Sequence, residues 1–213
     1  MVSTKRPASN KASAKRRNDP EGVRSRVLDA AAALFQAQGY HATGMRDVID
    51  KTGLSPGAFH HHFPTKESLA IAVINERVAP AVREAWIDPV RDAAHLRQGV
   101  SSVFADIIRG LDERGKVSGC PLNNLAMELS LTNPRMRDAL RSVFVEWQDA
   151  LETRIARSPR GKQWSKDQRR AAASFIVASY SGAMNLSKAA QDSAPLKAMQ
   201  KTVSQWLADQ QLD

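Results

Sequence analysis

The stretch from Gly53 to Phe63 constrains the fold of this chain most strongly, because it has the pattern of a helix end, a tight turn and a second short helix. Gly53 is suited to the left-handed backbone that ends a helix. Ser55 is suited to cap the next helix, and Pro56 supplies the first φ angle of that helix already set. We therefore predict two helices that meet at a sharp turn.

The residues on either side of this turn continue the helical pattern. Before the turn, Met45, Val48 and Ile49 are spaced as one buried face of a helix. After it, Thr65 is a candidate cap, and Lys66 lies in the exposed first turn of a further helix. Two short helices joined by a glycine-containing turn, in basic surroundings, indicate a helix-turn-helix.

Charge is concentrated in the first third of the chain. The formal net charge is +9, and residues 1–66 hold eleven Lys and Arg against five Asp and Glu. Such a balance favours an anionic partner. Residues 1–20 have too few apolar side chains to fold, so we expect a disordered basic arm. The arm either contacts phosphate or the minor groove beside the helix-turn-helix, or it is a solubilising tail.

Other compositional features concern the cellular compartment. The arm lacks the apolar core of a signal peptide, and no apolar run approaches the roughly 18 residues that span a bilayer. We therefore expect a cytoplasmic protein with no membrane partner. Cys120 is the only cysteine, which excludes an intramolecular disulfide and agrees with a reducing compartment.

Apolar residues recur at helical spacing along the whole chain, and no strand-like alternation of any length or internal repeat appears. The pattern predicts an all-α protein of about nine helices. Thr43 is the expected cap of the second helix, and we expect the helix from Lys66 to kink near Pro80 and to end near Pro89. The other predicted helices cover 24–38, about 93–113, 121–131, 134 to just before 157, 167–190 and 196–207.

The helix-turn-helix and its surroundings resemble the tetracycline-repressor-type (TetR) family of one-component transcriptional regulators. The resemblance covers Arg24 to Val78, and the residues that carry it are Val27-Leu28-Asp29-Ala30-Ala31, Leu34-Phe35, Gly39-Tyr40, Thr43, Val48, Gly53-Leu54-Ser55, Gly57, Phe63-Pro64 and Lys66-Glu67-Ser68-Leu69. It implies a three-helix DNA-binding domain at 21–66 and a helical ligand-binding and dimerisation domain at 67–213. His60 and Pro56 depart from the family pattern, which commonly has Tyr and Lys at these positions.

The candidate DNA-binding residues lie at the helix starts and on the second helix of the motif. Hydroxyls and backbone N–H groups at helix N-termini either meet phosphate or act only as caps. Gly57 and Ala58 have little side chain, so the backbone can approach base edges closely, and Ala58 can meet a thymine methyl group. The full set is Thr43, Arg46, Ser55, Pro56, Gly57, Ala58, His60, His61 and Lys66.

The run from His60 to His62 also raises the question of a metal site. Successive helical residues point about 100° apart, so three consecutive imidazoles cannot close on one ion. We expect no metal and no cofactor, and we expect His62 to pack into the head with Phe59 and Phe63. No metalloprotease, nucleotide-binding or serine-hydrolase motif is present, so we do not expect an enzyme.

The resemblance further implies a homodimer that forms through about 167–207 and presents two recognition helices to a pseudo-palindromic double-stranded DNA operator. A small apolar or amphipathic effector, still unidentified, would release the repressor from this operator. Aromatic and apolar residues of the second domain, with two polar ones, are the candidate ligand-binding residues. They are Trp86, Phe104, Ile108, Leu111, Cys120, Asn124, Phe144, Trp147, Phe175 and Tyr180.

Two alternatives remain open from the sequence. Cys120 precedes Pro121 at a predicted helix N-terminus, where the helix dipole lowers a thiol pKa, so the protein is either an electrophile or redox sensor or has a small buried cap at this position. The other alternative is a DNA-binding protein without an effector, which a large, closable cavity would argue against.

Overall fold

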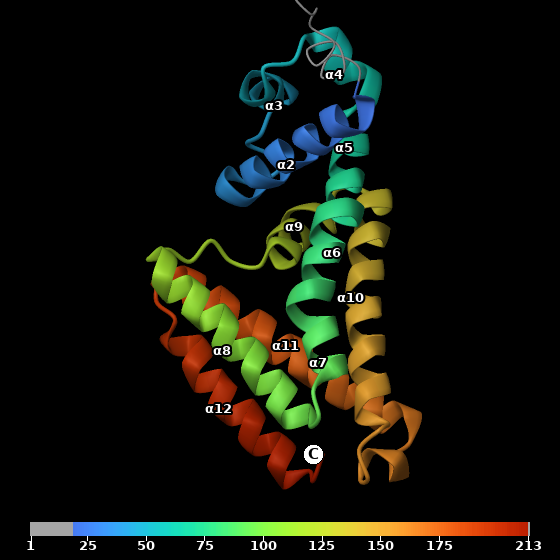
Figure 1. The fold of residues 1–213 in the computed structure, drawn as a ribbon, viewed down its shortest axis with the longest axis vertical. Coiled ribbons are helices and arrows are strands. Elements are labelled where there is room, and N and C mark those ends of the chain that lie inside the picture. Colours follow the sequence, from blue (N-terminus) through green and yellow to red (C-terminus); the bar gives the residue numbers. More distant parts are fainter. Residues whose placement is uncertain (1–18, 213) are drawn as a thin grey trace, which may run out of the picture.

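The computed structural model describes residues 19–212, and these residues form an all-α fold of nine helices if the uninterrupted helical stretch from Lys66 to Asp92 is counted as one (Figure 1). This confirms the predicted fold class. The predicted arm, apart from its last two residues, lies outside the described residues. The helices are α2 (Pro20–Gln38), α3 (Met45–Thr52), α4 (Pro56–His62), α5 (Lys66–Val73), α6 (Ala79–Val82), α7 (Asp88–Asp92), α8 (Leu96–Arg114), α9 (Pro121–Leu129), α10 (Pro134–Ile155), α11 (Lys166–Ala190) and α12 (Ala194–Asp209).

Helices α2, α3 and α4 form a small head at one end of the molecule (Figure 1). Gly53 ends α3 with φ of 66°, and the Ser55 side chain accepts a hydrogen bond from the backbone of Ala58 at the start of α4, both as predicted. Phe59 and Phe63 are buried beneath α4, and their rings lie 6.4 Å apart. The turn therefore holds α4 at a set angle to α3, with its opposite face in solvent.

The expectation that Thr43 caps α3 is wrong. Gly44 occupies the cap position, and its backbone N–H donates to the Asp47 carboxylate at 2.7 Å. Thr43 is buried instead, and its hydroxyl donates to the Gly39 carbonyl at 2.7 Å. Gly39 has φ of 90°, so the chain turns back sharply enough after α2 for this bond to close the connection to α3.

The stretch from Lys66 to Asp92 joins the head to the body and is helical throughout. Two π-helical turns, η1 (Ile74–Val78) and η2 (Arg83–Ile87), interrupt its α-helical parts. Pro80 and Pro89, which have no backbone N–H, each follow one of these turns closely. The wider turns shift the hydrogen-bond register and let the helix continue past Pro80. The stretch ends at Asp92, close to the end expected near Pro89.

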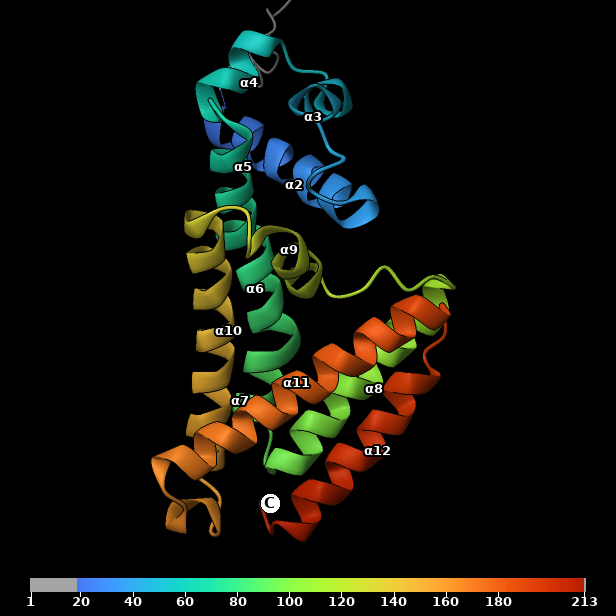
Figure 2. The ribbon, with the colours of Figure 1, turned by 180° about the vertical axis from the view of Figure 1, so that it is seen from behind.

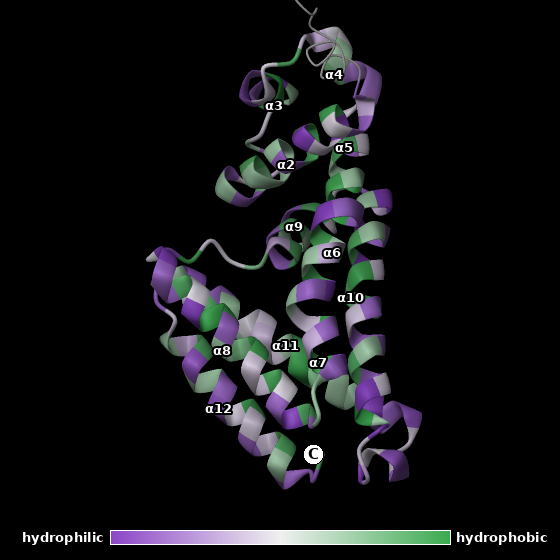
Figure 3. Cartoon of the chain, viewed as in Figure 1, coloured by the Kyte–Doolittle hydropathy of each residue, from purple (hydrophilic) through white to green (hydrophobic). Residues whose placement is uncertain are grey.

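The body consists of α8 to α12 packed around the lower part of this stretch. Helix α10 runs beside α6 and α7, while α8, α11 and α12 form an inclined layer on the other side, visible from both sides (Figures 1 and 2). The hydrophobic residues gather where helices face each other, and the connection between α10 and α11 is mostly hydrophilic (Figure 3). That connection holds a short 3-10 turn, η3 (Gly161–Gln163).

Candidate nucleic-acid interface and internal cavity

The outer face of α4 is the most open part of the head. Pro56, Gly57, Ala58, His60 and His61 are all exposed, and no atom lies within 4 Å of the place a Cβ on Gly57 would occupy. The backbone at the start of this helix is therefore uncovered. Its free N–H groups and small side chains suit close approach to the edges of bases and to phosphate.

The basic candidates around α4 differ in how free they are. The Arg46 side chain is 91% exposed and lies 3.9 Å from Asp50, which leaves its guanidinium available for phosphate. Lys66 is half-buried: its ammonium lies 4.2 Å from the centre of the Tyr40 ring and 3.4 Å from the His41 carbonyl oxygen. Burial lowers the pKa of Lys66. Its contact with phosphate would need the ammonium to leave this ring.

Two hydroxyl candidates are already occupied within the head. The Ser55 hydroxyl accepts from the Ala58 N–H at 3.3 Å, which leaves it one lone pair and its proton for an outside partner. Thr43 is 1% exposed, and its hydroxyl is used within the turn. Thr43 is therefore removed from the candidate DNA surface, because its side chain faces the interior.

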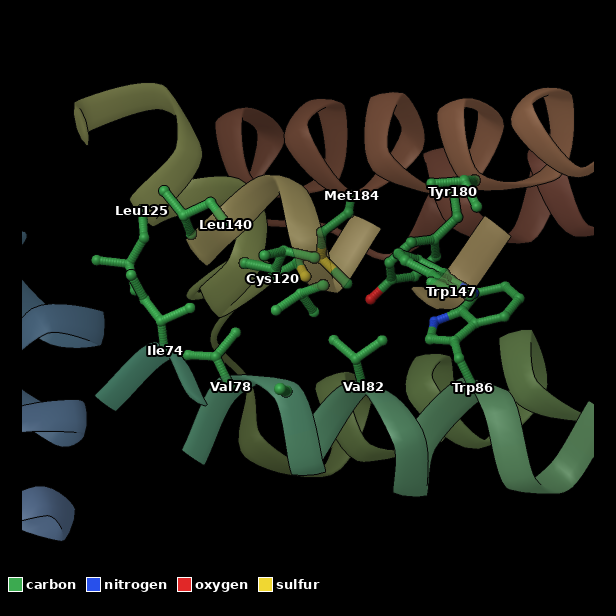
Figure 4. Packing of buried hydrophobic residues seen from close by; sticks show 14 of the residues in the cluster. Ile74, Val78, Val82, Trp86, Cys120, Leu125, Leu140, Trp147, Tyr180 and Met184 are labelled. Carbon is green, nitrogen blue, oxygen red and sulfur yellow. The ribbon is translucent and has the colours of Figure 1, made fainter. Parts of the chain in front are cut away.

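The body contains a cavity of about 450 Å³ below the head (Figure 4). This volume lies in the range of small-molecule sites in proteins. One wall is the helical stretch α5–α7, and the opposite wall combines α8, the start of α9, α10 and α11. The lining includes Val78, Val82, Trp86, Leu111, Cys120, Trp147, Tyr180 and Met184.

Three aromatic rings, those of Trp86, Trp147 and Tyr180, line one end of the cavity, and the Phe104 ring lies behind them. The ring of Trp86 lies 5.0 Å from that of Trp147, 4.8 Å from that of Tyr180 and 5.5 Å from that of Phe104. All four side chains are at most 5% exposed. Each ring comes from a different segment: Trp86 from η2, Phe104 from α8, Trp147 from α10 and Tyr180 from α11. Packing among these four segments therefore sets the shape of this end of the cavity.

Cys120 and Tyr180 are the polar groups of this interior. Burial raises the pKa of the Cys120 thiol, against smaller opposing effects of hydrogen bonds from the backbone. Burial likewise raises the pKa of the Tyr180 hydroxyl, and the neighbouring Cys120 adds to this. Cys120 precedes α9 as predicted, but the loss of solvent outweighs the helix N-terminus, so the thiol stays protonated.

The structure brings half of the predicted ligand-binding residues to the cavity. Trp86, Leu111, Cys120, Trp147 and Tyr180 line it. Phe104 lies behind the lining in ring contact with Trp86, and Ile108 is buried on the same helix without lining the cavity. Helical spacing identifies an apolar face but does not say which of its residues border a space.

Three predicted ligand-binding residues lie elsewhere, which corrects the expectation. Phe175 is 37% exposed and its ring lies 4.5 Å from that of Trp206 on the outside of α11 and α12. Phe144 borders a separate groove, which it lines together with Leu140 and Arg141. Asn124 hydrogen-bonds to the connection between α8 and α9, outside the cavity.

Gln36 of α2, which the sequence did not single out, bonds the head to the rim of the cavity. Its side-chain amide donates to the carbonyl oxygens of Ser118 at 3.1 Å and Gly119 at 2.8 Å, directly before Cys120. The Asn124 amide donates to Gln36 at 3.1 Å, and Lys188 of α11 donates to Asn124 at 2.9 Å. A lone glutamine on a polar helix face gives no sequence signal of such contacts.

Comparison with known proteins agrees with this architecture. Residues 27–73 match the family described as bacterial regulatory proteins of the tetR family, and residues 97–202 match the C-terminal domain of LmrA/YxaF-like transcriptional regulators. The regulator UidR of Escherichia coli is 34% identical over 133 residues, which cover 57% of this chain and 68% of UidR. The chain belongs to the TetR family of transcriptional regulators.

Further relatives extend the likeness over most of the chain. The regulator LmrA of Bacillus subtilis is 29% identical over 174 residues, covering 81% of this chain and 90% of LmrA. The crystal structure of a TetR transcriptional regulator from Chloroflexus aurantiacus superposes with a TM-score of 0.72 at 31% identity, covering 89% of this chain and 96% of that one. The protein is therefore a DNA-binding transcriptional regulator of the repressor type.

Between residues 19 and 212, no helix is both long and apolar enough to cross a membrane. Within the same range, no three His, Cys, Asp or Glu side chains come together in a way that could hold a metal ion. His60 and His61 point away from the packed side of α4, which is the arrangement expected from their spacing.

Proposed function

We propose that this protein is a homodimeric repressor that binds a pseudo-palindromic DNA operator and leaves it when a small apolar or amphipathic effector fills the cavity. One observation carries the proposal: the helical stretch Lys66–Asp92 belongs to the head at one end and forms a wall of the cavity at the other. A change in the cavity wall therefore moves the base of the head. The cavity also argues against a regulator that has no effector.

In this proposal α4 enters the major groove of the operator, and other parts of the head contact the DNA backbone on either side of that groove. Gly57 and Ala58 approach base edges, and His60 and His61 donate to bases or phosphate. Arg46 neutralises phosphate, as does Lys66 once it leaves the Tyr40 ring. Ser55 and Pro56 set the first turn of the helix, whose backbone N–H groups face the phosphates.

The proposed dimer uses the outer faces of α11 and α12. Among the exposed residues of α11, which also include Asn185 and charged residues near both ends, five small or apolar ones recur at helical spacing as one stripe: Ala171, Phe175, Ala178, Gly182 and Leu186. The small residues let a second copy approach closely, while Leu186 and Phe175, whose ring contacts that of Trp206, supply apolar area. A two-fold axis here would set the two α4 helices in successive grooves on one face of the operator.

Release follows from a shift between two conformations of the dimer. An effector that binds better to a conformation with widely spaced heads draws the population toward it and lowers operator affinity by the same coupling free energy. The bonds from Gln36 to Ser118 and Gly119 give a second connection, because these residues adjoin Cys120 at the cavity. A non-covalent effector is favoured over an electrophile, since Cys120 is buried and its pKa is raised.

The test begins with the unmodified full chain. Fragments of the source genome that the full chain retains should share one inverted repeat, and the genes beside it indicate candidate effectors. A binding titration with that operator should then show lower affinity when the effector is added. If the retained fragments shared no sequence, the proposed specific operator would be wrong. Unchanged operator affinity at saturating effector would overturn the proposed release mechanism.

A further inference from the structure

The polarity of the cavity is divided between its mouth and its interior. Glu84, Asp106 and Arg114 are the charged residues among the lining, and all three are exposed. The buried lining is apolar or aromatic apart from Cys120 and Tyr180. A ligand that carries a full charge into this interior would lose its hydration without meeting an opposite charge.

The aromatic end of the cavity holds hydrogen-bond donors that have no acceptor. Trp86 Nε1 and Trp147 Nε1 are buried, and neither has a hydrogen-bond partner. A buried donor without a partner is destabilising, so such groups commonly mark a place where a ligand or water completes the bonding. Both residues line the cavity, and because their two nitrogen atoms are themselves covered, a bound molecule reaches these donors only after small side-chain movements.

Trp86 and Tyr180 direct their polar atoms toward the same space. Figure 4 shows the Trp86 nitrogen and the Tyr180 oxygen both turned toward the part of the cavity between Val82 and Cys120. The Tyr180 hydroxyl lies beside Trp86 and Cys120, and the Trp86 and Tyr180 rings are 4.8 Å apart. Trp86 Nε1 is near enough to this hydroxyl to affect its pKa but does not have the geometry of a hydrogen bond to it. One ligand oxygen with two lone pairs can accept from both groups at once.

We propose that the effector is an uncharged, largely apolar compound with a carbonyl-type oxygen, which accepts hydrogen bonds from Trp86 Nε1 and the Tyr180 hydroxyl. Its apolar part packs against the apolar walls, and small side-chain movements bring the two donors onto the oxygen. This inference rests on the proposed role of the cavity as an effector site.

Two compounds of the same shape test the proposal. Fluorene and 9-fluorenone share one ring skeleton and differ only in the ketone that replaces a methylene group. Equilibrium dialysis against the full chain should show 9-fluorenone bound about tenfold more tightly. In Trp86→Phe and in Tyr180→Phe this ratio should fall to within about twofold, while fluorene still binds.

The ratio of the two affinities is measured within each variant, so a loss of packing or partial unfolding affects both compounds alike. Equal affinities in the parent protein would overturn the proposal, as would an unchanged ratio in both variants. A ratio lost only in Trp147→Phe would overturn the assignment to Trp86 and Tyr180. 9-Fluorenone-4-carboxylate should bind at least about tenfold more weakly than the ketone, and tighter binding would overturn the uncharged class.

Dialysis contains no DNA and reports on the cavity alone. A ketone preference in a protein that retains no specific genomic sequence would overturn the proposed regulatory function and leave the ligand class standing. Specific operator binding without a ketone preference would overturn the ligand class and leave the regulatory function standing.

Discussion

Single side chains decide how the head is attached to the body. The Arg24 guanidinium of α2 forms a bidentate ion pair with the Glu76 carboxylate, in which Nη2 donates to Oε1 at 2.6 Å. Arg77 Nε donates to the Asp29 carboxylate of α2 at 2.6 Å. The hydrogen bond from Arg24 is the largest cause of the lowered pKa of Glu76. These pairs lie where the head meets the long helical stretch, so they stabilise the angle between the two.

The lowered pKa of Glu76 makes this contact depend on pH. A carboxyl group with a lowered pKa stabilises the fold above its unfolded pKa of about 4.3, and this contribution is lost as the pH falls through the folded pKa. Glu76→Gln should therefore lower the free energy of unfolding at pH 7 by about 0.5 kcal/mol, a modest amount because both side chains are over one-third exposed. Urea unfolding at pH 7 and below pH 4 should show the difference shrinking at acid pH. The exposed Glu113→Gln is the control, and a difference independent of pH would contradict the prediction.

Burial of Cys120 leads to a prediction about its reactivity. Since the thiol is 7% exposed and its pKa is raised, iodoacetamide at pH 8 should modify the folded protein at least about tenfold more slowly than the chain in guanidinium. Mass spectrometry of timed samples measures the two rates. Equal rates would instead favour the sensor hypothesis, and so would a Cys120→Ser variant that no longer responds to its effector.

At the scale of elements, the short α4 helix combines a buried side and a bare side. Its buried side rests on Phe59, whereas its first turn carries nothing larger than Pro56 and Ala58. The helix depends on the head for its stability, because seven residues are too few for an isolated helix. The residues of α4 that face solvent are therefore different from those that hold the helix in position, so a substitution on the exposed side can change DNA binding without unfolding the head.

Gly57→Ala tests this separation. The added methyl group meets no atom within 4 Å, and Ala is favoured over Gly in helices, so the free energy of unfolding should rise by about 0.5 kcal/mol. The same methyl group stands where base edges should approach, so operator affinity should fall about tenfold, or ~1.4 kcal/mol. Thermal unfolding and operator titration measure the two effects. Unchanged affinity would show that α4 does not approach DNA with this turn.

The connection between α8 and α9 is held by α2 and α11 together. Gln36→Leu keeps the side-chain size but removes its bonds to Ser118, Gly119 and Asn124, so it should destabilise the fold by about 1–2 kcal/mol. Amide hydrogen exchange in residues 117–120 should speed up. Gln38→Leu is the matched control, because Gln38 bonds only within the head, to Ala42 and Thr43. Similar exchange in both variants would contradict the proposed connection.

For the whole molecule, the outward face of α11 is the feature that a single copy does not explain. Leu186 is 61% exposed and Phe175 is 37% exposed, on the same stripe as Gly182. Exposed apolar side chains in a continuous stripe mark contact surfaces. The arrangement of the two heads, and with it the spacing of the operator half-sites, follows from how two such stripes meet.

Leu186→Arg should convert the proposed dimer to monomers, because a charge within the stripe loses its hydration on association. Sedimentation velocity at micromolar concentration measures the change, and operator affinity should fall with it. Leu131→Arg is the matched control, since Leu131 is 98% exposed on the connection between α9 and α10, away from the stripe. Equal sedimentation of both variants and the parent would contradict the proposed interface.

The sequence by itself determined the order of the helices and the ends at Gly53 and Ser55, because apolar spacing and most capping are local properties, whereas the cap of α3 was predicted wrongly. Gly53, Ser55 and the face of Met45, Val48 and Ile49 specify α3, its turn and α4 within twenty residues. Only the tertiary structure decided which apolar residues border a cavity and which fill the core. Phe175 and Trp86 are both aromatic residues within predicted helices, yet Phe175 is on the surface and Trp86 lines the cavity, since that depends on how distant helices pack. The contacts of Gln36 and the burial of Cys120 depend on the same long-range packing.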